Sequence, residues 1–400
     1  MIYLKALLLC ASHNDLGLIL ALKKLGYEIT VTGSISGLIG EKYADKYIRA
    51  DYSDKEEILR IAREEHIDVI CPCCNDFGVY TAAYVAEQMN LKGYDSYETT
   101  LTINNKDRFK VLAKELNICT PESEGFTDKE SAIKYIENIG MPVIIKPTDA
   151  SAGNGITKLD DGNTDKEVKL AVEYAFSKSK AGRIVIDRYV KGTQHGFCTF
   201  LINQKVVAVC SNNEYSVINP YRVEIDTYPA DNYDRVAAVL IEQIERIATY
   251  LNLADGIFHL QYIECDGTPY IIEVMRRVLG NMYSVPGNML TGINWDYWEV
   301  KARCGMNLDD FPANVKQEGY YAYKTILANA NGTIRNVTIP ETYNKYLVDK
   351  CILKNIGDEV TNYKSQPIGF LFMIFSSMEE MKKILIEEYV SDMVEIDNIT

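Results

Sequence analysis

Residues 140–156 decide the fold, and they read Gly140-Met-Pro-Val-Ile-Ile-Lys146-Pro-Thr-Asp-Ala-Ser-Ala-Gly153-Asn-Gly155-Ile156. The β-branched run at 143–145 predicts a short buried strand that ends at Lys146. The two glycines that follow allow positive φ and a close backbone approach to a ligand. A fixed lysine beside a loop rich in free N–H groups suits a polyphosphate. The lysine precedes the glycines, so the stretch is not a P-loop, and by itself it fits a surface hairpin equally well.

The composition is that of a soluble globular chain with two or three domains. The 400 residues are 47% hydrophobic and 24% charged. The net charge of −14 argues against nucleic acid or an anionic membrane as the main partner. Ten cysteines are scattered, and their one cluster, at 71–74, has no second pair at zinc spacing. We therefore expect reduced, buried thiols and a cytoplasmic protein, since the apolar run at 6–11 is too short to span a membrane.

Residues 1–95 alternate between predicted strands and helices. Strands are expected at 4–10, 28–32 and 68–71, and helices at 15–25, 54–65 and 77–89. This alternation predicts a parallel sheet with helices on its faces, as in a Rossmann-like domain. No GxGxxG follows the first strand, so an NAD-dependent dehydrogenase is the weakest function considered. Asn75 and Asp76, after the third strand, are either ligand contacts or a helix cap.

The middle of the chain predicts antiparallel strands. Further elements are expected as a connector at 94–105, helices at 108–116, 131–139, 234–251, 296–303 and 378–389, and strands at 184–189, 197–202, 205–210, 258–264, 269–274, 320–327 and 369–375. Asn203-Gln204 reads as a two-residue hairpin turn. The fold class expected is therefore α/β followed by α+β.

Charged residues gather where these strands end. Lys146 ends one strand, segment 187–190 ends the next, and Glu273 and Arg277 end the last of them. Lysines bind the α- and β-phosphates of ATP, a carboxylate holds Mg²⁺, and an arginine neutralises charge on a transferred phosphoryl group. Segment 187–190 offers backbone groups to an adenine edge. Together these parts have the chemistry of an ATP site.

Their order along nearly the whole chain resembles the ATP-grasp superfamily. The similar branch holds the carbamoyl-phosphate synthase large-subunit halves, glycinamide ribonucleotide synthetase and biotin carboxylase. The resemblance implies a Rossmann-like pre-ATP-grasp domain at 1–95 and an ATP-grasp domain at 96–310, with a small lid at about 118–190 and an antiparallel sheet. A C-terminal α+β segment, 311–400, is implied to pack on the ATP-grasp domain.

The resemblance also assigns roles to residues. One lysine precedes the lid and a second precedes the glycine-rich lid loop; a linker E-[EK]-[FY]-[ILV] holds adenine, and E-x-N-x-R binds metal and the reacting group. The implied nucleotide-binding residues are Lys106, Lys146, Ser151, Ala152, Gly153, Asn154, Gly155, Asp187, Arg188, Tyr189, Val190 and Gln194. Glu273 and Gln261 are the implied metal ligands, and Arg277 and Lys146 the catalytic residues.

Three positions depart from the family pattern. Gln261 stands where a carboxylate is usual, twelve residues before Glu273; Met275 replaces the asparagine of E-x-N-x-R; Gln194 replaces a ribose-binding glutamate. Magnesium prefers hard oxygen ligands, and a thioether is soft. We therefore expect ATP with one Mg²⁺ rather than two. His259 lies on the same strand face as Gln261. It is either a substitute metal ligand or, as we expect, a packed and hydrogen-bonded histidine.

The function implied by the resemblance is an ATP-dependent carboxylate–amine ligase that acts through an acyl phosphate. Its partners are a small-molecule carboxylate and an amine, and a homodimer is common in this group. The alternative is a degenerate ATP-grasp protein that binds nucleotide with little turnover, as a subunit or sensor. Four further residues are expected either to face the acceptor or to pack ordinarily: Arg222, Arg276, Asn281 and Tyr283.

Overall fold

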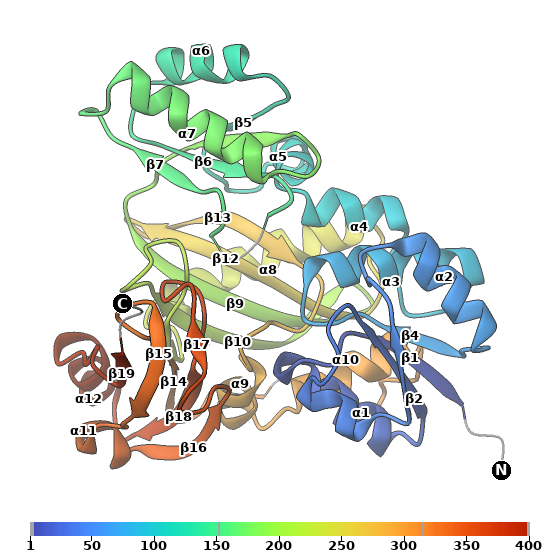
Figure 1. Cartoon of the computed structure of the whole chain (residues 1–400). Coiled ribbons are helices and arrows are strands. Elements are labelled where there is room, and N and C mark those ends of the chain that lie inside the picture. The colour runs from blue at the N-terminus through green and yellow to red at the C-terminus, as the bar shows by residue number, and fades with distance from the viewer. Residues whose placement is uncertain (1–3, 151–152, 314, 398–400) are drawn as a thin grey trace.

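The computed structural model describes residues 4–150, 153–313 and 315–397 (Figure 1). Its first sheet is parallel, as predicted, with the strand order β3-β2-β1-β4. The strands are β1 (Lys5–Leu9), β2 (Glu28–Gly33), β3 (Lys46–Arg49) and β4 (Val69–Cys71), and the helices beside them are α1 (Leu16–Lys24), α2 (Lys55–Glu64) and α3 (Asp76–Met89). Short 3₁₀ turns lie at His13–Asp15 and Ile39–Tyr43. The edge strand β3 was not predicted, because four residues with a charge at each end carry little strand signal.

Two helices of this part begin at side chains that cap them. The Asp54 carboxylate accepts the N–H groups of Glu56 and Glu57 at the start of α2. The Asn75 side chain accepts the N–H of Phe77 at the start of α3. Such caps satisfy N–H groups that have no partner within the helix. Of the two readings offered for Asn75, the helix cap is present.

A small antiparallel sheet carries the opening stretch of the sequence. Its order is β5-β8-β6-β7, from β5 (Ser123–Phe126), β6 (Val143–Pro147), β7 (Thr157–Leu159) and β8 (Ile184–Arg188). Helices α6 (Lys129–Ile139) and α7 (Asp165–Lys178) pack together against it (Figure 1). Val143 and Ile145 are fully buried under these helices, so burial of the β-branched run fixes the strand whose end carries Lys146.

The largest sheet has eight antiparallel strands, as the middle of the sequence predicted. Its order is β13-β12-β9-β10-β11-β14-β18-β16. The strands are β9 (Thr193–Ile202), β10 (Lys205–Tyr215), β11 (Ile225–Tyr228), β12 (Gly256–Cys265), β13 (Thr268–Met275), β14 (Tyr320–Ile326), β16 (Leu347–Ile352) and β18 (Gly369–Phe375). The C-terminal strands β14, β18 and β16 thus continue the sheet that the middle of the chain begins.

The C-terminal segment adds a three-stranded sheet and short helices. The sheet order is β17-β15-β19, with β15 (Gly332–Val337), β17 (Glu359–Val360), β19 (Val394–Asp397), α11 (Glu341–Asn344) and α12 (Met378–Lys382). The helix expected at 378–389 ends its α-helical part early and continues as a π-helical turn, Lys383–Glu387. No helix among the described residues is long and apolar enough to cross a membrane.

The segment at 94–105 was expected to be an irregular connector, and this prediction was wrong. It contains helix α4 (Tyr97–Asn104), which is followed by α5 (Lys106–Glu115). The Ser96 side chain caps α4, and Thr100 and Ile103 are buried. Threonine and asparagine are poor helix formers, so packing rather than propensity stabilises this helix.

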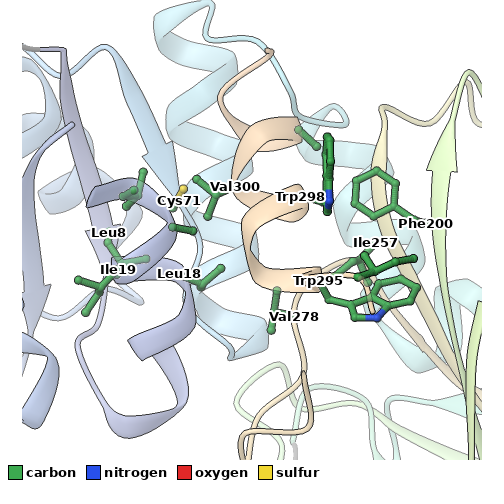
Figure 2. Packing of buried hydrophobic residues seen from close by; sticks show 14 of the residues in the cluster. Leu8, Leu18, Ile19, Cys71, Phe200, Ile257, Val278, Trp295, Trp298 and Val300 are labelled. Atoms are coloured by element: carbon green, nitrogen blue, oxygen red, sulfur yellow. The ribbon is translucent and has the colours of Figure 1, made fainter. Parts of the chain in front are cut away.

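Helix α10 (Trp295–Arg303) joins the parallel sheet to the large sheet (Figure 2). Figure 2 shows Trp298 beside Phe200 of β9, whereas Val300 on the same helix points toward the parallel sheet. The Trp298 ring meets Phe311 edge to face, with 5.0 Å between ring centroids. Helices α8 (Tyr233–Tyr250) and α9 (Ser284–Thr291) complete the packing around the large sheet.

We predict that Trp298→Ala lowers the free energy of unfolding by about 3–5 kcal/mol, because it removes a buried indole between two layers. Leu170→Ala, at a position that is 54% exposed on α7, is the matched truncation and should change it little. Urea unfolding followed by circular dichroism measures both. Equal losses in the two variants would contradict this role of α10.

Candidate functional site

A cleft of about 740 Å³ runs between the parallel sheet, the small sheet and the large sheet. Its size is in the range of small-molecule sites. Lys106, Lys146, Glu273 and Arg277 all line it. Residues far apart in the sequence therefore share one space.

The structure places most of the predicted nucleotide-binding residues, but not all of them, along this cleft. The cleft is lined by Lys106, Lys146, Gly153, Asp187, Arg188, Tyr189, Val190 and Gln194, and by the predicted metal ligands Gln261 and Glu273. Asn154 and Gly155 belong to the same loop without lining the cleft. Ser151 and Ala152 lie outside the described residues. Gly153 has a φ of +74°, and a Cβ there would lie 2.5 Å from the Tyr221 carbonyl oxygen, so only glycine fits.

Lys146 is held by a buried carboxylate. Its Nζ lies 2.9 Å from Asp187 Oδ2, and Lys110 Nζ lies 3.6 Å from Asp187 Oδ1. Burial would raise the pKa of Asp187, but the charges of Lys110 and Lys146 lower it. Burial lowers the pKa of Lys110 to about 8, although Asp187 opposes this. Lys110 was not predicted; its spacing of four residues from Lys106 on one helix face was the available signal.

Lys106 spans from α5 to the large sheet and to the lid loop. Its Nζ lies 2.5 Å from Glu273 Oε1 and donates to the Ala150 carbonyl at 3.3 Å. Burial by itself would lower the pKa of Lys106, but the charge of Glu273 outweighs this effect, and the pKa is raised above its usual value. The ammonium is therefore charged and already faces an anionic group.

Arg277 is paired with the parallel-sheet part of the molecule. Its Nε donates to Asp76 Oδ1 at 2.6 Å, and Asp76 is in the first turn of α3. Burial would raise the pKa of Asp76, but Arg277 lowers it. Asp76 lines the cleft too, so the sequence-based candidate after the third strand reaches the site through this ion pair.

Arg276, the neighbouring residue, points elsewhere, so the reading in which it faces the acceptor is wrong. Its side chain is 2% exposed. It bonds Asp95 Oδ2 at 3.0 Å and the Ile257 carbonyl at 2.6 Å. Alternate residues of a strand end face opposite sides, which is why 276 is a packing residue and 277 a cleft residue. Arg222, Asn281 and Tyr283 do line the cleft.

The linker at 187–190 leaves one amide available. The N–H of Arg188 donates to the Glu122 carbonyl at 2.8 Å, and the N–H of Tyr189 to the Pro142 carbonyl at 3.0 Å. The N–H of Val190 has no partner within the described part of the chain. Val190 is half-buried and lines the cleft, so this donor is placed to meet a ligand edge there.

The donor set fits one magnesium ion that arrives with phosphate. Gln261 and Glu273 face each other in the strand register, and Met275 faces His259. One carboxylate and one amide oxygen are hard ligands, whereas the thioether is not. Among the described residues, no group of three or more His, Cys, Asp or Glu could hold a metal by itself. Further ligands would have to be phosphate oxygens and water.

His259 is a packed residue. Burial and then the charge of Arg277 lower its pKa to about 3, so it is neutral at physiological pH. Its ring meets that of Tyr283 at 5.7 Å, edge to face. Of the two readings from the sequence, the packed histidine describes this environment.

Two acidic residues of the cleft were not predicted. Glu214 on β10 accepts the Nε2 groups of both Gln194 and Gln261, each at 2.7 Å. Asp226 on β11 faces Glu214 in the register. Burial raises the pKa of Glu214, and burial together with the charge of Glu214 raises the pKa of Asp226. The sequence hid them because Ser-Asn-Asn, at 211–213, has low strand propensity and made β10 look shorter.

Comparisons with known proteins agree with this geometry. Residues 105–311, more than half of the chain, match the family model "Carbamoyl-phosphate synthase L chain, ATP binding domain". The chain therefore belongs to this ATP-grasp family of ATP-dependent ligases. The carbamoyl phosphate synthase large chain of Clostridium botulinum (strain Alaska E43 / Type E3) is 23% identical over 266 residues, 64% of this chain and 24% of that protein. That of strain Kyoto / Type A2 is 25% identical over 272 residues, with the same coverage. The chain thus spans about a quarter of the length of these relatives.

Solved structures show that the ATP-grasp fold extends over the whole chain. The L-amino acid ligase from Bacillus licheniformis is 18% identical with a TM-score of 0.83, covering 100% of both chains. Phosphoribosylglycinamide synthetase from Anaerococcus prevotii is 18% identical with a TM-score of 0.76, covering 99% of this chain and 100% of that one. The biotin carboxylase domain of Hydrogenobacter thermophilus 2-oxoglutarate carboxylase, a dimer solved with MgADP and bicarbonate, is 19% identical with a TM-score of 0.77, covering 99% and 92%. At these identities the likeness establishes the fold.

We predict that Lys146→Met lowers the free energy of unfolding by about 3–5 kcal/mol, because it leaves the buried Asp187 carboxylate with the more distant Lys110 alone. The double variant Lys146→Met/Asp187→Asn should recover most of this loss without recovering affinity for a fluorescent ADP analogue. Lys129→Met, at an exposed lysine, is the control. A double variant no more stable than the single one would contradict the ion-pair explanation.

Proposed function

We propose that this protein is an ATP-dependent ligase that joins a small-molecule carboxylate to an amine and converts ATP to ADP and phosphate. One observation carries the proposal: Lys106, Lys146, Arg277 and the facing pair Gln261–Glu273 line a single cleft. The donor types are those that phosphoryl transfer needs, since its catalysis depends on positioning and charge stabilisation.

Each group has a proposed role. Lys106 and Lys146 bind nucleotide phosphates, and segment 187–190 binds the adenine edge with the free Val190 amide. Glu273 and the Gln261 carbonyl hold one Mg²⁺, which supplies positive charge to phosphate oxygens when bound. Phosphates would take the positions that Glu273 and Asp187 now hold beside the two lysines.

The proposed chemistry has two steps. A substrate carboxylate oxygen attacks the γ-phosphorus of ATP, and the bond between this phosphorus and the β-phosphate oxygen breaks. ADP departs, and the substrate carboxylate has become an acyl phosphate. The amine nitrogen then attacks the acyl carbon, phosphate leaves, and the nitrogen gives up one proton. Arg277 faces the charge that develops in both steps. Asp76 positions the guanidinium from the opposite side of the cleft.

We predict that Mg-ATP with paired pools of carboxylates and amino compounds gives phosphate release that depends on both pools. Arg277→Lys keeps a cation beside Asp76 but loses the planar fork, and it should lower kcat by about 100-fold with a smaller change in KM for ATP. Arg335→Lys, at an exposed position, is the matched control. Absence of release above a Lys146→Met background, across a broad panel, would contradict the ligase.

A second candidate, a nucleotide-binding protein with little turnover, is favoured by Met275. This thioether lines the cleft where an amide would serve a metal better. We predict that Met275→Asn raises metal-dependent ATP hydrolysis about tenfold if the site lacks a ligand. Gln261→Glu is the poorer test, because its carboxylate would meet Glu214. If the Met275→Asn variant binds nucleotide but hydrolyses ATP no faster than the wild type, a missing metal ligand is not the cause of low turnover.

The homodimer remains a prediction, and size-exclusion chromatography with light scattering is its measurement.

A further inference from the structure

Glu214 and Asp226 form a pair of facing carboxylates within the cleft. They are direct partners across the β10–β11 register, and they are 8% and 1% exposed. Both line the cleft. Neither forms an ion pair with any lysine, arginine or histidine of the described chain. Like charges that face each other across two strands destabilise a sheet, so this pair needs an explanation.

Neutral amides surround the pair, while burial raises the pKa of Glu214, and burial with the charge of Glu214 raises that of Asp226. Gln194 and Gln261 both donate to Glu214 Oε2, and Asn212 Nδ2 donates to Asp226 Oδ1 at 2.6 Å. Hydrogen bonds of this kind orient carboxylates, but a buried negative charge is balanced fully only by a cation. Gln194 and Gln261 donate to the same carboxylate, so the polar contacts of this part of the cleft are centred on Glu214.

A glycine lies directly against the pair. A Cβ at Gly196 would lie 2.4 Å from Asn212 Oδ1 and 3.0 Å from Glu214 Oε1. The absent side chain therefore lets Asn212 and Glu214 lie against β9, within reach of Gln261 on the next strand.

A second, independent observation is an unpartnered polar group. His259 lines the same cleft, is 2% exposed, and its Nδ1 has no hydrogen-bond partner among the described residues. Its ring contacts Tyr283, whose hydroxyl donates to Asn212. Buried nitrogens are normally paired, so the cleft wall has an unused hydrogen-bonding group, which is connected to Asp226 through Tyr283 and Asn212.

No cationic side chain forms an ion pair with the two acids in the described part of the chain. Of the cations that line the cleft, Lys106 faces Glu273, Lys146 faces Asp187 and Arg277 faces Asp76, whereas Arg222 donates to the Ser365 carbonyl. A primary ammonium has three donors and no acceptor, which matches two carboxylates with free oxygens.

We propose that the Glu214–Asp226 pair is the subsite for the primary ammonium group of the amine substrate. This inference rests on the proposed ligase function and specifies its substrate class: a small molecule that carries a cationic primary amine. The pair lies on the same sheet face as Glu273 and Gln261, separated from them by β9. The bound ammonium would give one proton to a carboxylate of the pair and then, as a neutral amine, approach the acyl phosphate along that face.

The test measures the melting temperature with Mg²⁺ and a non-hydrolysable ATP analogue. The probes are a mixture of the proteinogenic L-amino acids and the same mixture N-acetylated, which lacks the ammonium. The free amino acids should raise the melting temperature of the wild-type protein, and the acetylated mixture should not. Asp226→Asn should abolish this shift and raise the KM of any active amine at least tenfold, whereas Asp161→Asn, at an exposed loop aspartate, should do neither.

The ligand-free variant separates binding from structure. Asp226→Asn replaces one of two facing carboxyl groups with an amide of similar size, so its melting temperature without ligand should equal or exceed that of the wild type. A lower value would show a merely structural acid and would overturn the proposal. Equal shifts from acetylated probes, or a Mg²⁺-only shift that Asp226→Asn loses, would overturn it as well. If the wild type ligates no amine, the ligase proposal fails, while the ammonium subsite is still decided by the melting temperatures.

Discussion

The register of the eight-stranded antiparallel sheet is the constraint on which the site depends. Gln261 faces Glu273 on one side and Gly196 on the other. Glu214 faces Asp226 further along the same sheet. Because side chains alternate with a period of two, a slip of one residue would turn each of these groups to the opposite face. Hydrogen-bonded strand pairs therefore place the polar groups more strictly than any loop could.

The same sheet face is apolar where it meets α10 and polar where it borders the cleft. Phe200 and Ile257 pack against the tryptophans of that helix (Figure 2). Further along β9, at Gly196, the absent side chain lets the polar side chains of Asn212 and Glu214 lie against the strand. One sheet thus anchors the parallel-sheet part of the molecule and also forms the wall of the site.

Ion pairs connect the parts that surround the cleft. Lys106 joins α5 to β13, Lys146 and Asp187 join two strands of the small sheet, and Arg277 reaches the first turn of α3. A buried ion pair contributes little net stability, although breaking it leaves an unpaired charge. In the ligand-free protein these ion pairs keep the cations oriented toward the cleft.

The predictions of secondary structure from the sequence were wrong where tertiary packing outweighed the local secondary-structure propensity. Residues 94–105 form a helix because Thr100 and Ile103 are buried, and β10 continues past Cys210 through polar residues because neighbouring strands on both sides pair with it. The prediction of a hairpin turn at Asn203-Gln204 was confirmed, because both residues adopt positive φ, at 50° and 62°, as a tight hairpin requires.

By itself, the sequence determined the strand that presents Lys146, the parallel and antiparallel halves, and the spaced residues that resemble an ATP-grasp protein, since these follow from local patterns of apolar residues, turns and charges. Only the tertiary structure decided that Asp187 holds Lys146, that Arg276 is buried while Arg277 reaches the cleft, and that Glu214 and Asp226 face each other. These contacts join residues up to 201 positions apart. Strand register and helix packing bring such residues together, and no local pattern records either of them.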